Sequence, residues 1–337
     1  MVRSYNSEGL SVERCLELVG LSPNQYYHKS SGKPVGRRPS TTTDHKSPYT
    51  SELTQVDNVD VLSRIVEIKL DPDHANYYRL ITITLCLQGY IINHKKVYRL
   101  MYEHLLLEDR KSVKGKNYVK YRRVAPQGAL QLLEMDIKYV YIHEKRRYAF
   151  VLTVIDTYTR YVLHWAAGYS MRTMQVQEVW EYILAHYIQP IRGKSAEVEI
   201  EVRSDNGKQF SSKQIMNFFE ENGLTKVFTH PYTPEENGHI ESFHSKLGKA
   251  LKHDRFADLQ ALEKRLTQFY TMYNNKRSHG SLKGIPPAIF WALEDLGYVK
   301  VTTNHEKRIN KIELNVAYQD ILGIPQINKH KYRAIRA

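Results

Sequence analysis

Paired cysteines, long apolar runs and a leader-like amino end are all missing from this sequence of 337 residues. Its two cysteines, Cys15 and Cys86, stand apart with no Cys-x-x-Cys spacing, which argues against a zinc ribbon or a disulfide framework. No stretch approaches the roughly 18 apolar residues of a membrane-spanning helix. The amino end also lacks the apolar core of a signal peptide. We therefore expect a cytoplasmic protein with no membrane partner.

Basic residues are in clear excess. The chain has 49 Lys and Arg against 36 Asp and Glu, a formal net charge of +13 and a pI near 9.4. Such an excess favours a polyanionic partner, because neutralising phosphates releases counterions. A merely basic soluble protein is the alternative. With 42% apolar residues, the chain has enough material for a buried core.

The amino-terminal part has the pattern of paired helices. In residues 1–28, Gly20 ends one helical segment, and Ser22 with Pro23 provides an N-cap and a first-turn proline for the next. This pattern is typical of a helix-turn-helix unit. Residues 29–55 are rich in Gly, Pro, Ser and Thr, and we interpret them as a basic flexible linker.

Residues 56–109 repeat the pattern on a larger scale. Helices are predicted over 59–70, 77–88 and 94–106, with Gly89 breaking the pattern and Asn93 capping the last helix. This predicts a second helix-turn-helix domain, whose last helix would enter the major groove of double-stranded DNA. The alternative is an exposed basic helix without a partner. The predicted DNA contacts near the start of that helix are His94, Lys95, Lys96 and Arg99.

A basic linker is predicted over residues 110–127. From Arg110 to Arg123 there are seven basic residues, two tyrosines and no acid. Such a segment is suited to follow a phosphate backbone, although most charge runs are only solvated surface. Lys120, Arg122 and Arg123 are the contacts we predict within it.

From residue 128 onward the pattern becomes that of an α/β domain, which we place at 128–295. Three strands are followed by alternating helices and strands, so a mixed sheet with helices on its faces is expected. The predicted strands are 129–142, 147–159, 160–170, 197–205 and 224–230, and the helices are 171–188, 211–223 and 234–252.

Three acids occupy special places in this domain. Asp136 lies in the middle of the first strand, Asp205 at the end of the fourth, and Glu241 on the last helix. If the fourth strand pairs with the first, the two aspartates become neighbours, and the helix can bring Glu241 over them. Three converging carboxylates repel one another unless a hard divalent cation binds them. Mg²⁺ or Mn²⁺ fits this donor set, and two such ions about 3.5–4 Å apart support phosphoryl transfer.

The spacing of these acids resembles a known family. Between Asp205 and Glu241 lie 35 residues, the D,D-35-E spacing of retroviral integrases and insertion-sequence transposases. The resemblance covers about residues 130–290 and implies a ribonuclease-H-like core. Four segments carry it: VIDTYTRYVLHW, RSDNGKQF, PYTPEENGHIESFHSKL and YNNKRSHGSLKGIPP.

The resemblance also implies roles for individual residues. Asp136, Asp205 and Glu241 would be the catalytic metal ligands, whereas Asp156 would lie near the site without being a core ligand. Asn237 lies one helical turn before Glu241 on the same face and would contact DNA. The residues expected to shape the site are Asn206, Gly207 and Thr233. For Asn237 and Thr233, ordinary helix-start roles are the alternative.

This sequence departs from the family pattern at three places. The family usually has Trp and Thr at positions 133 and 138, where this chain has Leu133 and Lys138. Seven residues after the Glu it has Gly248 in place of a basic residue that faces DNA. We expect neighbouring lysines to take over that contact. These are Lys246, Lys249 and Lys252.

Taken with the resemblance, these residues predict a bacterial transposase. It would bind the terminal inverted repeats of its element, cut to expose a 3′-OH and join that end to another strand. The family works as multimers, so at least a homodimer is expected, and a separately encoded helix-turn-helix/leucine-zipper partner remains open. A DNA-binding regulator without catalysis and a nuclease without joining activity are the alternatives. Residues 296–337 form a basic extension suited to DNA contact or subunit docking, or are a disordered tail.

Overall fold

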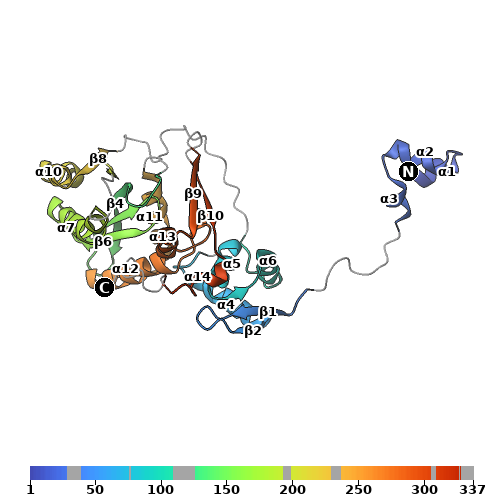
Figure 1. Cartoon of the computed structure of the whole chain (residues 1–337), viewed down its shortest axis with the longest axis horizontal. Helices are drawn as coiled ribbons and strands as arrows, with labels where there is room; N and C mark the ends of the chain where they lie inside the picture. Colours follow the sequence, from blue (N-terminus) through green and yellow to red (C-terminus); the bar gives the residue numbers. More distant parts are fainter. Residues whose placement is uncertain are drawn as a thin grey trace. The chain divides into compact units, whose positions relative to one another are not determined.

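The computed structural model describes residues 1–28, 39–75, 77–108, 126–192, 199–228, 237–304, 309–325 and 327 (Figure 1). The chain divides into two compact units, Met1–Thr41 and Thr42–Ala337. Some predicted site residues lie outside the described residues. These are Lys120, Arg122, Arg123 and Thr233.

The first unit is a small helical cluster. Its helices are α1 (Val2–Ser7), α2 (Val12–Val19) and α3 (Pro23–Tyr27). Gly20 ends α2 with a left-handed φ of 70°, and Ser22 forms a capping box with Gln25 at the start of α3. The two predicted helices and their signals are confirmed. A helix-turn-helix function for this unit stays a prediction.

Three further helices lie in the first part of the second unit, and each was predicted. They are α4 (Asn58–Leu70), α5 (Tyr78–Leu87) and α6 (His94–Glu103). Asn93 caps α6 as expected, since its side chain accepts a hydrogen bond from the Lys96 amide at 2.9 Å. The core of this helical group is formed by apolar side chains of all three helices. Its members include Val61, Ile65, Ile81, Leu85, Val97 and Leu100.

Part of the segment expected to be a linker forms a small sheet. The strands β1 (Thr42–Lys46), β2 (Leu53–Asp57) and β3 (Tyr90–Ile91) pair antiparallel in the order β2-β1-β3. Gly89 precedes β3 with a φ of 99°, and a Cβ there would collide with the Lys46 carbonyl. The pairing of β1 with β3 therefore depends on Gly89, which lies more than 40 residues after Lys46 in the sequence. The local composition of residues 29–55 does not reveal this dependence.

The α/β domain predicted at residues 128–295, which we call the catalytic-type domain, is built on a five-stranded mixed sheet. Its strands are β4 (Leu132–Ile142), β5 (Arg147–Asp156), β6 (Val162–Gly168), β7 (Ile200–Ser204) and β8 (Leu224–Phe228). The strand order is β6-β5-β4-β7-β8, with β4, β5 and β6 antiparallel and β7 parallel to both β4 and β8. The predicted pairing of the fourth strand with the first is confirmed.

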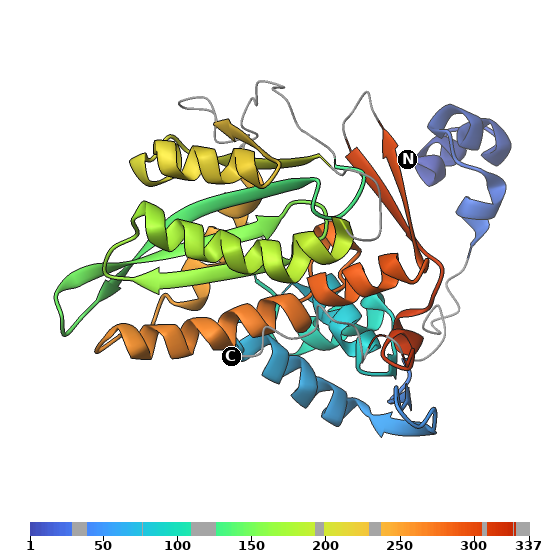
Figure 2. The ribbon, with the colours of Figure 1, turned by 60° about the vertical axis from the view of Figure 1, so that its left-hand side comes forward.

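Helices cover both faces of this sheet (Figure 2). On one face lie α7 (Thr173–Ile183), which continues as the π-helical turn η1 (Leu184–Ile188), and α10 (Lys213–Glu221). On the other lie α11 (Gly238–Ala250) and α12 (Leu259–Asn275). The short helices α8 (Gln189–Arg192) and α9 (Lys208–Ser211) connect these elements.

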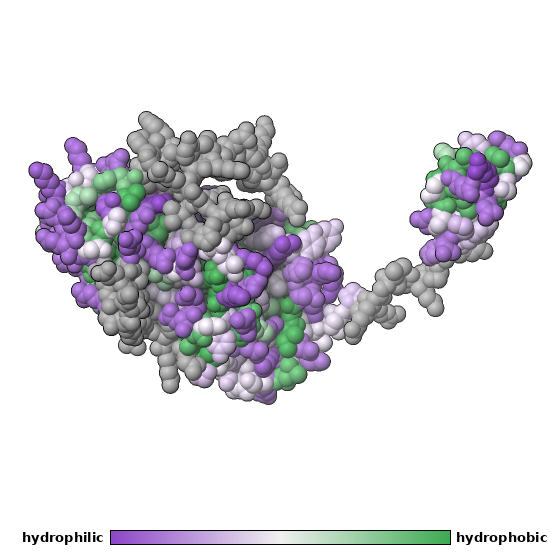
Figure 3. Space-filling model, turned by 45° about the horizontal axis from the view of Figure 1, so that its top comes forward, coloured by the Kyte–Doolittle hydropathy of each residue, from purple (hydrophilic) through white to green (hydrophobic). Residues whose placement is uncertain are grey.

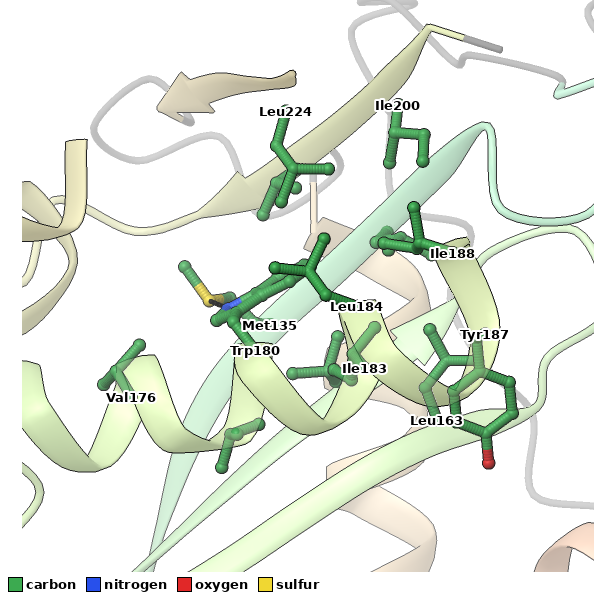
Figure 4. Close-up of a cluster of buried hydrophobic side chains, with 14 of the residues drawn as sticks. Met135, Leu163, Val176, Trp180, Ile183, Leu184, Tyr187, Ile188, Ile200 and Leu224 are labelled. Atoms are coloured by element: carbon green, nitrogen blue, oxygen red, sulfur yellow. Dashed lines mark hydrogen bonds between the residues drawn. The ribbon is translucent and has the colours of Figure 1, made fainter. Parts of the chain in front are cut away.

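Alternation along β4 divides its side chains between the two faces. Leu133, Met135 and Ile137 pack with α7, where Figure 4 shows Met135 next to Trp180. Val140 and Ile142 instead pack with α11 and α12. Because successive side chains of a strand point to opposite faces, the even-numbered polar residues of β4 also face α11.

The carboxyl-terminal part returns to the helical group. Its elements are η3 (Gly280–Leu282), α13 (Pro287–Asp295), β9 (Val299–Asn304), β10 (Ile309–Leu314) and α14 (Tyr318–Ile321). Lys46 forms an ion pair with Asp320 at 2.6 Å, and the Tyr318 hydroxyl donates to the Lys283 carbonyl at 2.7 Å. The described part of the predicted basic extension is thus folded rather than a disordered tail.

The surface hydropathy and the two cysteines fit a sequence that lacks long apolar runs and paired cysteines. Figure 3 shows hydrophilic residues over much of the face it presents, with smaller hydrophobic areas between them. Among the described residues, no helix has both the length and the apolar character needed to cross a membrane. Cys15 and Cys86 are buried and form no disulfide.

Candidate active site

Asp136 and Asp205 belong to neighbouring parallel strands. In the register of β4 with β7, Glu134 pairs with Arg203. Two residues farther along, the same register aligns Asp136 with Asp205, the first residue after β7. Neighbouring strands lie about 4.8 Å apart. The sheet therefore brings the two aspartates onto neighbouring elements, as their positions in the sequence predicted.

Helix α11 lies along β4 on the face to which Asp136 points. At its start, the Glu134 carboxylate accepts hydrogen bonds from the amides of His239 (3.0 Å) and Ile240 (2.8 Å). One turn later, His244 Nδ1 lies 3.2 Å from Asp136 Oδ2. A carboxylate at a helix amino terminus satisfies free amides and favours the helix dipole. Glu134 thereby fixes the first turn of α11, which carries Glu241.

The three predicted ligands remain accessible. The Asp136 side chain is 30% exposed, and Asp205 and Glu241 are exposed. Among the described residues, no group of three or more His, Cys, Asp or Glu side chains is close enough to hold a metal ion. The acids thus lie on neighbouring elements without forming a closed ligand set. Accessible carboxylate oxygens on adjacent strands nevertheless fit a hard divalent cation, since such ions choose oxygen ligands.

Asp156 has a different environment from these acids. It is fully buried, and its carboxylate accepts hydrogen bonds from the Leu130 amide and from both the amide and the hydroxyl of Thr159. Burial raises the pKa of this carboxyl. Its oxygens organise the turn after β5 and do not face solvent, which supports the choice of Asp136 over Asp156.

The turn after Asp205 is closed by a hydrogen bond from a backbone amide. The Gly207 amide donates to Asp205 Oδ1 at 3.0 Å. A Cβ on Gly207 would lie 2.5 Å from Gln209 Nε2 and 3.1 Å from Asp205 Oδ1, so a larger residue would displace both. Asn206, between them, is exposed. Gly207 therefore holds the Asp205 carboxylate in place, consistent with a site-shaping role.

Asn237 stands at the start of α11. It occupies the N-cap position, but its side chain makes no capping hydrogen bond. The residue is buried, and its Oδ1 has no hydrogen-bond partner among the described residues. An ordinary capping role is thus not what the side chain performs, and a DNA contact remains a prediction.

Sequence reasoning missed a cation beside Asp205. Lys226 lies on β8, and its ammonium donates a hydrogen bond to Ser204 Oγ, next to Asp205. Burial lowers the pKa of Lys226 to about 7, and the Asp205 charge opposes that shift. The signal in the sequence was a lysine in the middle of a short apolar strand.

Lys138 and Gly248, two departures from the family pattern, lie next to each other in the structure. Lys138 on β4 reaches across α11 at Gly248, where an added Cβ would lie 3.3 Å from Lys138 Nζ. A basic residue at 248 would meet that ammonium directly. The positive charge on this part of the site thus comes from the strand, and the helix leaves room for it.

Some of the other predicted DNA contacts are exposed, and others are bound to groups of the protein itself. Lys249 and Lys252 are exposed, whereas Lys246 is half-buried and donates to Ser242 Oγ at 2.7 Å. On α6, His94 and Lys95 are exposed. Lys96 instead donates to the Thr42 carbonyl at 2.6 Å, and Arg99 pairs with Glu103 at 3.3 Å. Lys96 and Arg99 thus have structural partners that the sequence pattern did not reveal.

Comparison with known proteins gives consistent relatives. The integrase core domain family matches residues 126–234, and a second integrase core domain family matches residues 222–287. An uncharacterized 39.2 kDa protein of insertion element IS476 from Xanthomonas euvesicatoria is 28% identical, over 84% of this chain and 73% of that protein. The putative transposase InsK of insertion sequence IS150 from Escherichia coli K12 is 27% identical, over 68% of this chain and 81% of that protein.

Among solved structures, the catalytic core domain of BIV integrase is similar, with a TM-score of 0.35 and 20% identity over 50% of this chain and 97% of that one. The two family matches together span residues 126–287, which include the sheet, the turn after Asp205 and α11. The two family matches and the sequence relatives support an insertion-sequence transposase of the integrase-like superfamily, an enzyme of the polynucleotidyl transferase type.

Proposed function

We propose that this protein binds the terminal inverted repeats of a mobile DNA element, cuts each end to expose a 3′-OH and joins that end to another DNA strand. One observation carries the proposal. The sheet register aligns Asp136 with Asp205, and α11, which bears Glu241, contacts Asp136 through His244. Three accessible acids thus come from the three elements that the integrase-like pattern requires.

The residues of the site have separable tasks. Asp136, Asp205 and Glu241 would hold two Mg²⁺ or Mn²⁺ ions, which activate an attacking oxygen and stabilise the leaving one. Gly207 orients the Asp205 carboxylate through its amide. Lys226 provides a positive charge beside Asp205, which lowers the repulsion among the acids.

DNA would be held by basic residues around this site and on α6. Lys249, Lys252, His94 and Lys95 are exposed and available for phosphate contacts. We propose at least a homodimer on paired DNA ends. A separately encoded helix-turn-helix/leucine-zipper partner is a further proposal.

The test is strand transfer in vitro. Purified protein is incubated with duplexes that end in the inverted repeats flanking its gene, with Mg²⁺ or Mn²⁺. Glu241→Gln is compared with Glu220→Gln, a matched change of an exposed acid on α10. We expect metal-dependent joined products from the native protein and the Glu220 variant, and none from the Glu241 variant.

Two other outcomes would replace the proposal. Specific binding of the repeats without metal-dependent cutting would make the protein a DNA-binding regulator. Cutting without joining, on a substrate that already carries a free 3′-OH, would make it a nuclease.

A further inference from the structure

Four basic side chains gather beside α11. Arg160 comes from the turn between β5 and β6, Lys246 from α11, and Arg277 and His279 from the segment after α12. Ser281 links two of them, since Arg160 Nε lies 3.4 Å and His279 Nδ1 3.0 Å from its Oγ. We call Arg160, Lys246, Arg277 and His279 the basic cluster.

The members of the basic cluster repel one another. The pKa of His279 lies well below its usual value, first because of burial and then because of the charges of Lys246 and Arg160. Burial, followed by the charges of Arg277 and Arg160, lowers the pKa of Lys246 to about 8. Positive charges have therefore been brought together in a half-buried place, which costs free energy unless an anion compensates them.

Nearby acids compensate these charges only in part. Glu134 and Asp156 face Arg160, but their carboxylates already accept hydrogen bonds from backbone amides. Asp73 faces Arg277, but its carboxylate binds Arg265 in a two-point ion pair, and Arg277 reaches only the Asp73 backbone carbonyl.

Arg160 has both a strained backbone and a hydrogen-bond donor that is unsatisfied within the described part of the chain. Its backbone has a φ of 60°, the left-handed region that residues other than glycine rarely adopt. Its Nη1 is buried and has no hydrogen-bond partner among the described residues. Buried donors without acceptors are rare and costly. Strained, unsatisfied groups of this kind are often found in ligand-binding sites.

We propose that the basic cluster binds a phosphate of the DNA backbone. Two guanidinium groups with an ammonium group suit a phosphate, because the planar fork of arginine matches its oxygens. This proposal rests on the proposed function, since it takes DNA as the ligand. It gives a role to two segments that the carboxylate site does not use, VIDTYTRYVLHW and YNNKRSHGSLKGIPP.

The basic cluster and the three carboxylates are also linked through α11. Lys246 lies five residues after Glu241 on the same helix, and Glu134 both faces Arg160 and holds the first turn of α11. A phosphate bound by the basic cluster would therefore fix a DNA strand at a set distance from the three carboxylates.

The experiment measures the affinity for duplex DNA against salt concentration, by fluorescence anisotropy and without divalent metal. It compares the native protein with Arg160→Gln and Arg277→Gln, and with Lys276→Gln as the control. Lys276 is exposed and directly precedes Arg277, so the control removes the same charge from the same segment. For each Arg variant we expect the slope of log K against log salt to fall by about one phosphate contact. The Lys276 variant should keep the native slope.

A second measurement guards against misfolded variants. Inorganic phosphate should raise the melting temperature of the native protein more than chloride at equal ionic strength, and Lys246→Met, which leaves both arginines in place, should lose that difference. Native slopes in both arginine variants, together with an unchanged phosphate effect, would overturn the proposal. If the native protein joins DNA under those outcomes, only the basic cluster is refuted. If slopes fall as expected but no joining occurs, the proposed function fails and the phosphate site stands.

Discussion

Two parts of the site are built in opposite ways: the acidic side consists of Asp136, Asp205 and Glu241, and the basic side is the basic cluster. On the acidic side, the side chains are exposed or partly exposed. On the basic side, Arg160 Nη1 is buried and finds no hydrogen-bond partner in the part of the chain that the structure describes, and His279 is half-buried. Water stabilises exposed charges even when they repel each other, whereas buried charges depend on the fold.

That difference also decides what holds each side in place. The acids are set by strand register and by a glycine turn, which are properties of the sheet. The basic cluster is set by a left-handed turn at Arg160 and by the segment after α12. The latter is anchored from outside the catalytic-type domain, because Asp73, between α4 and α5, binds both Arg265 and Arg277.

The largest effect should come from breaking the acidic side alone. Asp205→Asn removes a charge from an exposed position without creating a cavity, so we expect the fold and the DNA affinity to be kept. Joining should fall by about 10³-fold or more, as when a group acting in a catalytic set is removed. Product formation on gels and anisotropy with the same duplex measure the two properties. Joining within a few-fold of native would contradict the assignment of Asp205.

The anchor of the basic side should matter for stability. Arg265 makes contacts of 2.6 and 2.9 Å with the Asp73 carboxylate, and both side chains are less than a fifth exposed. Asp73→Ala leaves this guanidinium with an unpaired face and should cost about 3 kcal/mol of unfolding free energy in urea titrations. The matched control is Asp254→Ala, which removes a single 2.9 Å contact to the same arginine from a more exposed acid. A control as damaging as Asp73→Ala would show that the two-point contact is unimportant.

The basic side should also make stability depend on pH. The pKa of His279 is lower in the folded protein than in the unfolded chain, so the unfolded chain binds its proton more readily. Stability should therefore fall as pH drops below about 6.5, the unfolded value. His279→Gln removes this component, and its melting temperature should decrease less between pH 7 and pH 5 than that of the native protein. Parallel pH profiles of the two proteins would show that His279 does not titrate as described.

The smallest effect concerns Lys138 and Gly248. Alanine within a helix is about 1 kcal/mol more favourable than glycine. A Cβ at position 248 would press on the Lys138 ammonium, so Gly248→Ala alone should change stability by less than that amount. In a Lys138→Ala background the full gain should appear. Equal gains in both backgrounds, measured by urea unfolding, would show that the two residues are independent.

How far the sequence predicts the structure differs between the two sides. Strand alternation, the Asp205 turn and the helix after it were all predicted, because each depends on short-range patterns that hydrophobic periodicity reveals. The basic cluster was not predicted, since its members lie as far apart as Arg160 and His279, and only the packing of α12 against the sheet brings them together. Lys226 and the strand β1 were missed for the same reason. Each depends on a partner that is distant in the sequence, Ser204 for the lysine and β3 for the strand.

The central claim, that acids from three elements form one metal site, is tested most directly by the binding of Mn²⁺. Free Mn²⁺ is measured by electron paramagnetic resonance in titrations of the protein bound to duplex DNA. Asp136→Asn, Asp205→Asn and Glu241→Gln should each weaken Mn²⁺ binding by about tenfold or more, as the loss of an anionic ligand predicts. Glu220→Gln should bind Mn²⁺ like the native protein. Native Mn²⁺ affinity in the Glu241 variant, with both aspartates required, would contradict the three-acid site.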